Sequence, residues 1–271
     1  MTPLEFVLLS IPYDLKSSLR RGAREGPHAI KAALFEEVFN PYSELGINTR
    51  EEAILLERGP VPAIDNFLLF EEAVLREVQK VRKDQVLITI GGDHSVTVPV
   101  LKGLRKIHGK LNLLYLDAHP DLYPEYQGDP YSHGSVTSRA LDLGPWGQIV
   151  QIGIRAATAL QSQRAMKNRI RIINAWRFEE AMGLSVKGPT YLSIDLDVLD
   201  PAFAPGVGNP VPGGISTRQF FDWIHSLDAE LIGFDICELN PRWDRAGITA
   251  ITAARTMMEL MAHCIERRGG G

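Results

Sequence analysis

The chain has little of several features that define large classes of protein. Its 271 residues include only two cysteines, Cys237 and Cys264, so no disulfide framework is expected. It has no long hydrophobic run: the apolar stretch 6–11 is too short for a signal peptide or a membrane span, and no basic region precedes it. We therefore expect a cytoplasmic protein that does not enter a membrane.

A strong charge of either sign is also missing. The net charge of -4 provides no electrostatic reason to expect nucleic acid or an anionic membrane as a partner. Internal repeats, low-complexity segments and linkers are absent as well, and a chain of this length can bury a large core. We therefore expect residues 1–271 to form a single domain.

Short apolar runs alternate along the chain with amphipathic segments. Strands are predicted at 4–11, 53–56, 85–90, 111–116, 148–154, 170–173, 190–196 and 231–236. Helices are predicted between them, including 67–82, 159–166, a helix capped by Ser216, and 248–266. This alternation indicates an α/β fold in which helices cover both faces of a parallel sheet.

The stretch 111–121 combines a buried strand with three side chains of the kind that bind metals. Residues 111–116 are mostly apolar, and Asp117, His119 and Asp121 follow at alternate positions. Alternate side chains of extended backbone point to the same side, so we expect these three to converge. Two carboxylates and an imidazole destabilise one another unless a cation lies between them, and a divalent metal is the simplest candidate.

Polar side chains follow three further predicted strands. His94 comes after the third strand, Asp195 and Asp197 end the seventh, and Glu238 comes after the eighth. Taken singly, His94 could be a packed side chain in a tight turn, the Asp pair a loop cap, and Glu238 a solvated charge. Ligands of parallel sheets bind beyond the carboxyl ends of the strands, so the shared placement favours one functional site.

The candidate metal ligands are four aspartates and two histidines: His94, Asp117, His119, Asp121, Asp195 and Asp197. This set is too large for one divalent ion but suits two, and oxygen-rich ligands without thiolate favour Mn²⁺, with Fe, Co or Ni as alternatives. Two adjacent metals bind and acidify a shared water. Four carboxylates and a hydroxide together carry roughly one more negative charge than two divalent metals neutralise. This net negative charge favours a cationic substrate over a phosphate ester.

These motifs resemble those of the ureohydrolases, the arginase and agmatinase family. The family's three metal motifs look like Gly-Gly-Asp-His-Ser at 91–95, Asp-Ala-His-Pro-Asp at 117–121 and Ser-Ile-Asp-Leu-Asp-Val-Leu-Asp-Pro at 193–201. Segments 21–27 and 151–155 look most like the agmatinase branch. The resemblance covers nearly the whole chain. It implies the three-layer arginase/deacetylase-like α/β fold with a mainly parallel eight-stranded sheet.

Carried over residue by residue, the resemblance implies two metal positions and an assembly. One metal would be held by His94, Asp117, Asp121 and Asp195. The second would be held by Asp117, His119, Asp195 and Asp197, so that Asp117 and Asp195 bridge the pair. The resemblance also implies a homo-oligomer, either a trimer or a hexamer.

Three residues gain catalytic roles from the same resemblance. Glu238, in Asp-Ile-Cys-Glu-Leu-Asn-Pro at 235–241, matches the guanidinium-binding glutamate, and a carboxylate can accept paired N–H bonds from a planar guanidinium. His133 matches the proton-shuttling histidine, whose ordinary pKa suits proton transfer near neutral pH. Asp121 would relay a proton to the leaving amine. The implied reaction is hydrolysis of a guanidino C–N bond to urea and a primary amine.

The loop after Asp121 is the sequence's main indication of the substrate. Segment 123–132 contains Tyr123, Glu125 and Asp129 but no Lys or Arg. An acidic rim would disfavour a carboxylate tail and suit agmatine, a small guanidino substrate with a second positive charge. The alternative is a solvated loop whose charges have no role.

Other readings of the same site stay open. Asn209, a substrate-binding candidate together with Tyr123, stands where the family usually has Thr, and Ala156 where Gly or Ser is common. An arginase or a guanidinobutyrase-like enzyme would need a basic group near the pocket, which Arg155 or Arg20 could supply. A non-catalytic metal-binding protein is a further alternative. A deacetylase is disfavoured because the chain has no His-His-Gly sequence.

Overall fold

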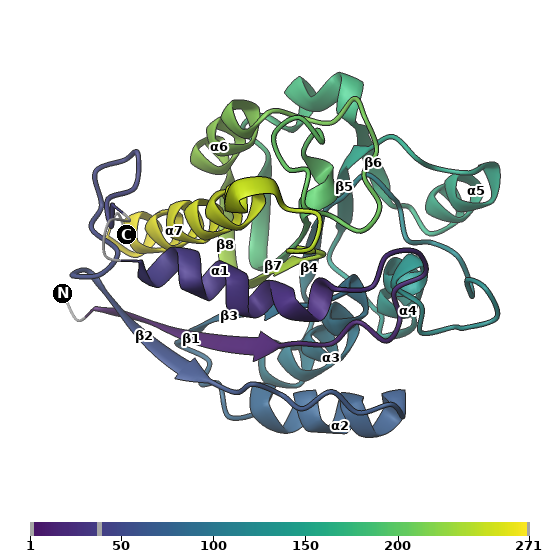
Figure 1. Ribbon diagram of the computed structural model, residues 1–271, viewed down its shortest axis with the longest axis horizontal. Coiled ribbons are helices and arrows are strands. Elements are labelled where there is room, and N and C mark those ends of the chain that lie inside the picture. The colour runs from purple at the N-terminus through teal and green to yellow at the C-terminus, as the bar shows by residue number, and fades with distance from the viewer. Residues whose placement is uncertain (1–2, 37–39, 270–271) are drawn as a thin grey trace.

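The computed structural model describes residues 3–36 and 40–269, and a single parallel β-sheet forms its centre (Figure 1). The strands are β1 (Leu4–Ile11), β2 (Ala53–Arg58), β3 (Val86–Gly91), β4 (Asn112–Leu116), β5 (Ile149–Ile154), β6 (Arg171–Asn174), β7 (Ser185–Asp195) and β8 (Asp228–Cys237). They pair in the order β2-β1-β3-β8-β7-β4-β5-β6, and every neighbouring pair is parallel. The expected eight-stranded sheet is therefore confirmed.

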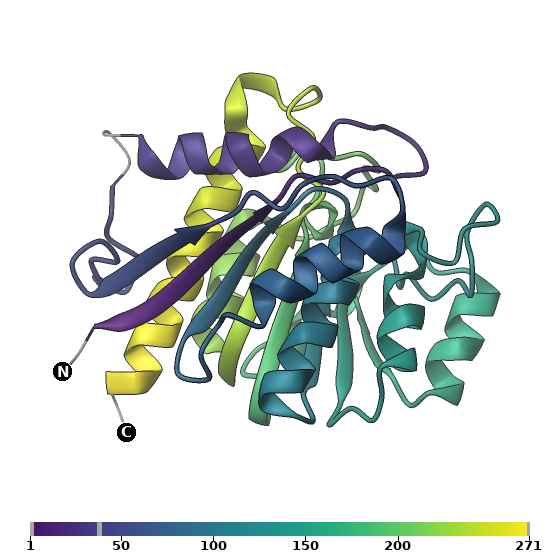
Figure 2. The ribbon, with the colours of Figure 1, turned by 90° about the horizontal axis from the view of Figure 1, so that it is seen from below.

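Helices cover both faces of this sheet (Figure 2). They are α1 (Gly26–Phe35), α2 (Phe67–Val78), α3 (Thr97–His108), α4 (Val136–Asp142), α5 (Ala159–Lys167), α6 (Thr217–Ser226) and α7 (Ile248–Gly269). Buried side chains of α1, α6 and α7 pack in one hydrophobic cluster, and those of α2, α3, α4 and α5 in a second cluster on the opposite face. The central strands β3 and β4 are buried along their whole length, which explains their nearly continuous apolar sequences.

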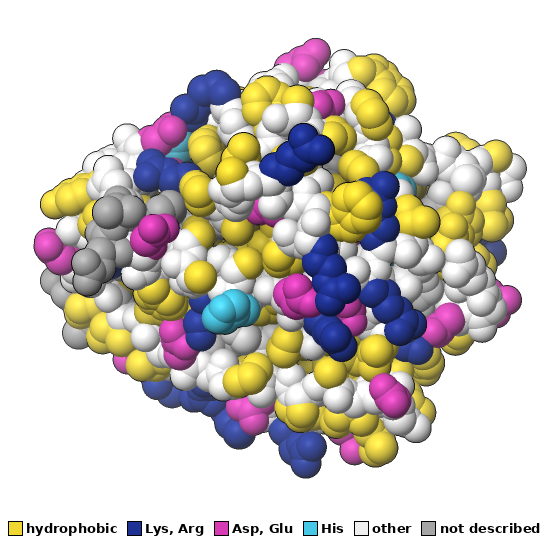
Figure 3. Space-filling view, viewed as in Figure 1, with side chains coloured by type: hydrophobic (Ala, Val, Ile, Leu, Met, Phe, Trp, Pro, Cys, Tyr) yellow, Lys and Arg dark blue, Asp and Glu magenta, His cyan; other side chains and the backbone are white. Residues whose placement is uncertain are grey.

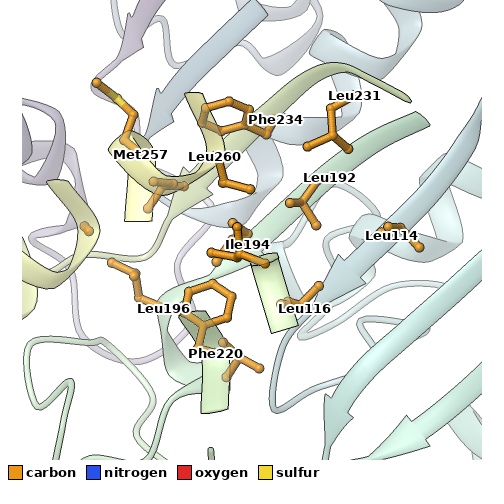
Figure 4. Packing of buried hydrophobic residues seen from close by; sticks show 14 of the residues in the cluster. Leu114, Leu116, Leu192, Ile194, Leu196, Phe220, Leu231, Phe234, Met257 and Leu260 are labelled. Atoms are coloured by element: carbon orange, nitrogen blue, oxygen red, sulfur yellow. The ribbon is translucent and has the colours of Figure 1, made fainter. Parts of the chain in front are cut away.

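The first cluster anchors the helices behind the strands that carry the polar residues (Figure 4). Phe220 of α6 and Leu260 of α7 are completely buried, and they belong to the same cluster as Ile194 of β7 and Phe234 of β8. Burial of each such side chain contributes roughly 1.5–3 kcal/mol relative to exposure. The predicted cap of α6 is confirmed, since Ser216 Oγ accepts from the Gln219 N–H.

Asp117, His119 and Asp121 do converge in the clusters that could hold metals, but the reason predicted for their convergence is wrong. Strand β4 ends at Leu116, and the backbone bends directly afterwards, so alternation along an extended chain does not align the three side chains. The Ala118 carbonyl accepts from two N–H groups that follow β5, and Asp121 adopts a left-handed conformation with φ of 47°. The side chains of Asp117, His119 and Asp121 are therefore directed by a bent loop.

The two largest differences between predicted and observed element boundaries are in α2 and β7. Helix α2 ends at Val78, where 82 was predicted, and β7 begins at Ser185, where 190 was predicted.

No helix within the described residues has the length and hydrophobicity needed to cross a bilayer. On the face seen in Figure 3, the Lys and Arg side chains of the described residues are interspersed with acidic and hydrophobic ones.

Candidate active site

The polar residues predicted from four separate motifs meet at one edge of the sheet. His94, Asp117, Asp195 and Glu238 lie at or just beyond the carboxyl ends of β3, β4, β7 and β8. These four strands are neighbours in the sheet, in the order β3-β8-β7-β4. The fold therefore brings together residues that are up to 144 positions apart in the chain, as in the contact between His94 and Glu238.

Three carboxylates surround the Nδ1 atom of His94. The distances from Nδ1 are 3.2 Å to Asp117 Oδ2, 3.4 Å to Asp195 Oδ2 and 3.8 Å to Asp121 Oδ2. The His94 ring is fully buried. This group has the composition expected for a metal site built from one imidazole and several carboxylates.

A second group forms around His119. Its Nδ1 lies 3.0 Å from Asp197 Oδ2 and 3.3 Å from Asp117 Oδ1. The two oxygens of Asp117 thus face different histidines, which is the arrangement that a bridging carboxylate requires. Asp195 also acts as a loop cap, since its Oδ1 accepts from the Asp197 N–H, while Oδ2 stays directed at His94.

The residues of these two groups suit divalent metals. The Oδ2 atom of Asp117 is buried and has no hydrogen-bond donor among the described residues. An unpaired carboxylate oxygen in the protein interior is costly unless a cation neutralises it. Oxygen and imidazole donors at this spacing are what such cations prefer.

Electrostatics supports the same conclusion. Burial and the neighbouring Asp117 carboxylate raise the pKa of Asp121 to about 8. Burial also raises the pKa of Asp195 well above its usual range. Burial alone would raise the pKa of Asp117, but the adjacent imidazoles of His119 and His94 bring it below its usual value. The site therefore holds protons on some carboxylates unless metal ions replace them.

We expect the metal-free protein to lose stability as the pH rises from 6 to 8. The pKa of Asp121 is about 8 in the folded chain and 3.8 in the reference state, so in this interval the folded state binds more protons. Each such group then costs about 1.4 kcal/mol per pH unit, or roughly 3–5 °C in melting temperature. Thermal unfolding in chelator at pH 6, 7 and 8 measures this loss. Added Mn²⁺ should remove it, and a flat profile in chelator would contradict the account.

Buried groups behind His94 hold its ring in place, and the sequence analysis did not identify them. Nε2 of His94 lies 2.7 Å from Ser193 Oγ, which donates to Asp235 Oδ1 at 2.8 Å. Tyr115 stacks on the imidazole and donates to Asp121 Oδ2 at 2.5 Å. Such partners orient metal-binding side chains. A hydroxyl among the three leucines of this strand was the available signal for Tyr115.

Glu238 and His133 are in contact, although they belong to motifs that lie far apart in the sequence. Glu238 Oε1 accepts from the His94 backbone N–H and lies 2.9 Å from Nδ1 of His133. Its Oε2 has no hydrogen-bond donor among the described residues and lies beside the site. Glu238 also has a φ of 68°, a strained conformation for a residue with a side chain. One oxygen is therefore fixed and the other is available to a ligand.

The second nitrogen of His133 contacts the loop after β1. The Ser18 N–H donates to Nε2 at 3.1 Å, and Ser18 Oγ lies 2.7 Å away, so Nδ1 carries the proton shared with Glu238. Burial alone would lower the pKa of His133, but the Glu238 carboxylate raises it to about 9. Asp93 holds this loop by accepting from the Lys16 N–H. A second proton, at Nε2, would break the hydrogen bond from the Ser18 N–H, and the new N–H could donate to Ser18 Oγ instead.

A cavity of about 110 Å³ opens above these groups. Beyond the metal-ligand candidates, His133 and Glu238, its lining is uncharged: Ser18, Tyr123, Tyr126, Gly134, Ala156, Gln161 and Asn209. The predicted acidic rim is wrong. Asp129 pairs with Lys16 at 2.6 Å, Glu125 is exposed, and neither lines the cavity. Lys16 lies 113 positions from Asp129 in the chain, so the loop sequence alone could not reveal this pair.

Neither arginine considered as a carboxylate partner lines the cavity. Arg155 donates to the backbone carbonyls of Gly153, Asp197, Val198, Leu199 and Val211. Arg20 lies 4.0 Å from the ring centroid of Trp243. Asn209 does reach the site: its amide nitrogen Nδ2 lies 3.1 Å from Nε2 of His119 and can donate to that nitrogen when it carries no proton.

Comparisons with known proteins agree with this geometry. The model of the Arginase family matches residues 4–263. The chain is 37% identical to the N(1)-aminopropylagmatine ureohydrolase of Thermus thermophilus, over 97% of this chain and 90% of that protein. It is 34% identical to the guanidinobutyrase of Pseudomonas aeruginosa, over 95% and 86%.

The fold shows the same relationship. The solved arginase from Medicago truncatula superposes with a TM-score of 0.89 at 29% identity, over 96% of this chain and 87% of that one. The eight-stranded parallel sheet is thus the arginase fold. The chain belongs to the arginase family of hydrolases that act on guanidino groups.

Proposed function

We propose that this protein hydrolyses agmatine to putrescine and urea and that it holds two Mn²⁺ ions. The observation that carries the proposal is Glu238, whose Oε2 has no hydrogen-bond donor among the described residues and whose side chain lines the same cavity as His119, Asp121, Asp195 and Asp197. A guanidinium bound there would lie beside the groups that can hold metals. With two divalent metals bound, the four aspartates and Glu238 leave about one net negative charge, which favours a cationic ligand.

The residues that line the cavity favour a substrate whose tail ends in an amine. No Lys or Arg of the described residues lines it, so a carboxylate tail would find no opposite charge. Tyr123 and Tyr126 stand side by side with ring centroids 5.0 Å apart, and aromatic faces attract ammonium groups. The relative named N(1)-aminopropylagmatine ureohydrolase also supports an agmatine-like substrate.

In this proposal each group of residues has its own role in the reaction. His94, Asp117, His119, Asp121, Asp195 and Asp197 would hold the two metals, which supply an acidified water when bound. Glu238 would orient the guanidinium so that its carbon faces that water. Asp121 would take a proton from that water as the water oxygen bonds to the guanidinium carbon, and would pass it to the nitrogen of the leaving amine as the C–N bond breaks. His133 would exchange protons with solvent through its contact with Ser18.

The assembly and the location of the protein rest on resemblance and sequence alone. We propose a trimeric or hexameric homo-oligomer in the cytoplasm, which acts on a small cationic molecule. Light scattering of the purified protein measures the assembly, and a monomer would contradict it.

Urea release by Mn²⁺-loaded protein tests the function. Agmatine, arginine, 4-guanidinobutyrate and guanidine should be compared at equal concentrations. We expect the highest kcat/KM with agmatine. Preference for a guanidino acid would keep the chemistry but overturn the tail assignment. No urea from any compound, with metal bound and the protein folded, would favour a non-catalytic metal-binding role.

A further inference from the structure

One side chain of the cavity wall has an unused hydrogen-bonding group. Gln161 lies in the first turn of α5, is only 2% exposed, and lines the cavity. It forms a capping box with Thr158: the Thr158 side chain accepts from the Gln161 N–H, and the Gln161 side chain accepts from the Thr158 N–H. The amide of Gln161 is thus fixed by the start of the helix.

The capping box determines which end of the amide faces the cavity. Gln161 Oε1 accepts from both the N–H and the hydroxyl of Thr158, each at 3.0 Å. A backbone N–H can only donate, so the amide cannot flip without losing this bond. Nε2 must therefore point away from Thr158, and it has no hydrogen-bond partner among the described residues. Two N–H donors are left for a ligand.

A second capping box in the chain shows that burial is not part of the motif. Ser216 and Gln219 make the same reciprocal bonds at the start of α6, but Gln219 is exposed. The Gln219 amide is open to solvent there. At α5 the same capping box lies on the wall of the cavity, where a bound ligand can take the place of water on the free donors.

We propose that Gln161 is a specificity-determining residue whose Nε2 donates to an acceptor at the distal end of the substrate. The inference rests on the proposed ureohydrolase function and extends it. Tyr123 and Tyr126 offer aromatic faces to an ammonium tail, and Gln161 offers N–H groups to a carboxylate. The enzyme therefore accepts a guanidino acid as a second substrate beside agmatine, and Gln161 sets the ratio between them.

Gln161→Glu tests this role without removing the helix cap. Glutamate is an equally good capping-box residue, so one oxygen keeps the bonds to Thr158 while the other replaces the two donors with a negative charge. We expect kcat/KM for 4-guanidinobutyrate to fall about tenfold or more, because like charges then meet in the cavity. The kcat/KM for agmatine should stay equal or rise. Competitive inhibition by 4-aminobutyrate should weaken relative to putrescine by a similar factor.

Gln163→Glu is the matched control. Gln163 lies on the same helix but is exposed and does not line the cavity, so the same change of charge should leave both kcat/KM values unchanged. Thermal unfolding of both variants checks that the helix is intact. An unchanged substrate ratio in Gln161→Glu, or an equal shift in Gln163→Glu, would overturn the proposal. Failure of the wild-type protein to release urea would instead reject the proposed function.

Discussion

Replacing Asp117 with asparagine is expected to abolish urea release and to deplete the protein of metal. The two oxygens of Asp117 lie 3.2 Å from Nδ1 of His94 and 3.3 Å from Nδ1 of His119, so one carboxylate serves both groups. Asparagine offers a single oxygen and no charge, and its amide nitrogen does not bind a divalent metal. Because the two sites share this ligand, we expect a loss in kcat/KM of about 10³-fold or more.

Metal content and folding separate this outcome from general damage. Elemental analysis after gel filtration should find substoichiometric metal in Asp117→Asn, with circular dichroism unchanged. Asp142→Asn is a suitable control, because Asp142 is an exposed aspartate at the end of α4. Urea release from Asp117→Asn within a few-fold of the wild-type rate would rule out a bridging role.

Glu238→Gln is expected to remove guanidinium binding while leaving metal content unchanged. The His94 N–H donates to Oε1 of Glu238, so the oxygen of the glutamine should take that position. The amide nitrogen then replaces Oε2 and presents donors to a guanidinium that itself only donates. Loss of the charge-assisted pair and introduction of two opposed donors should lower kcat/KM by about 10²–10³-fold.

Glu125→Gln is the matched comparison for that variant. Glu125 is an exposed glutamate of the loop after Asp121 and does not line the cavity, so its neutralisation should leave kcat/KM for agmatine unchanged. A large effect of Glu125→Gln would restore the acidic-rim hypothesis that the Lys16–Asp129 pair argues against. Loss of metal in Glu238→Gln would instead assign Glu238 a structural role.

Much of the fold could be predicted because its signals are local. All eight strands were located from short apolar runs, and the Ser216 cap was located from its position before an amphipathic helix. The extension of β7 to Ser185 was missed because Lys187, Gly188 and Pro189 interrupt its apolar pattern. The bend after β4 was missed because it depends on hydrogen bonds to residues that follow β5.

The site was predictable to the extent that its residues follow strands. His94, Asp117, His119, Asp195 and Glu238 were each identified from a motif at a strand end, and the structure brings them together. Groups that support or surround them were not identified, because Ser18, Tyr126 and Gln161 have no distinctive local sequence. Their roles depend on which loops the fold places around the cavity.

By itself, the sequence determined which kinds of side chain could bind metal and substrate in this protein, and the edge of the sheet at which they meet. Residue chemistry and hydrophobic periodicity are encoded locally, and the carboxyl ends of parallel strands necessarily lie on one side. Only the tertiary structure decided that β3, β8, β7 and β4 are neighbours, that Lys16 neutralises Asp129, and that the Gln161 amide faces the cavity. These contacts join distant segments, so they depend on sheet order and loop packing, which no local pattern specifies.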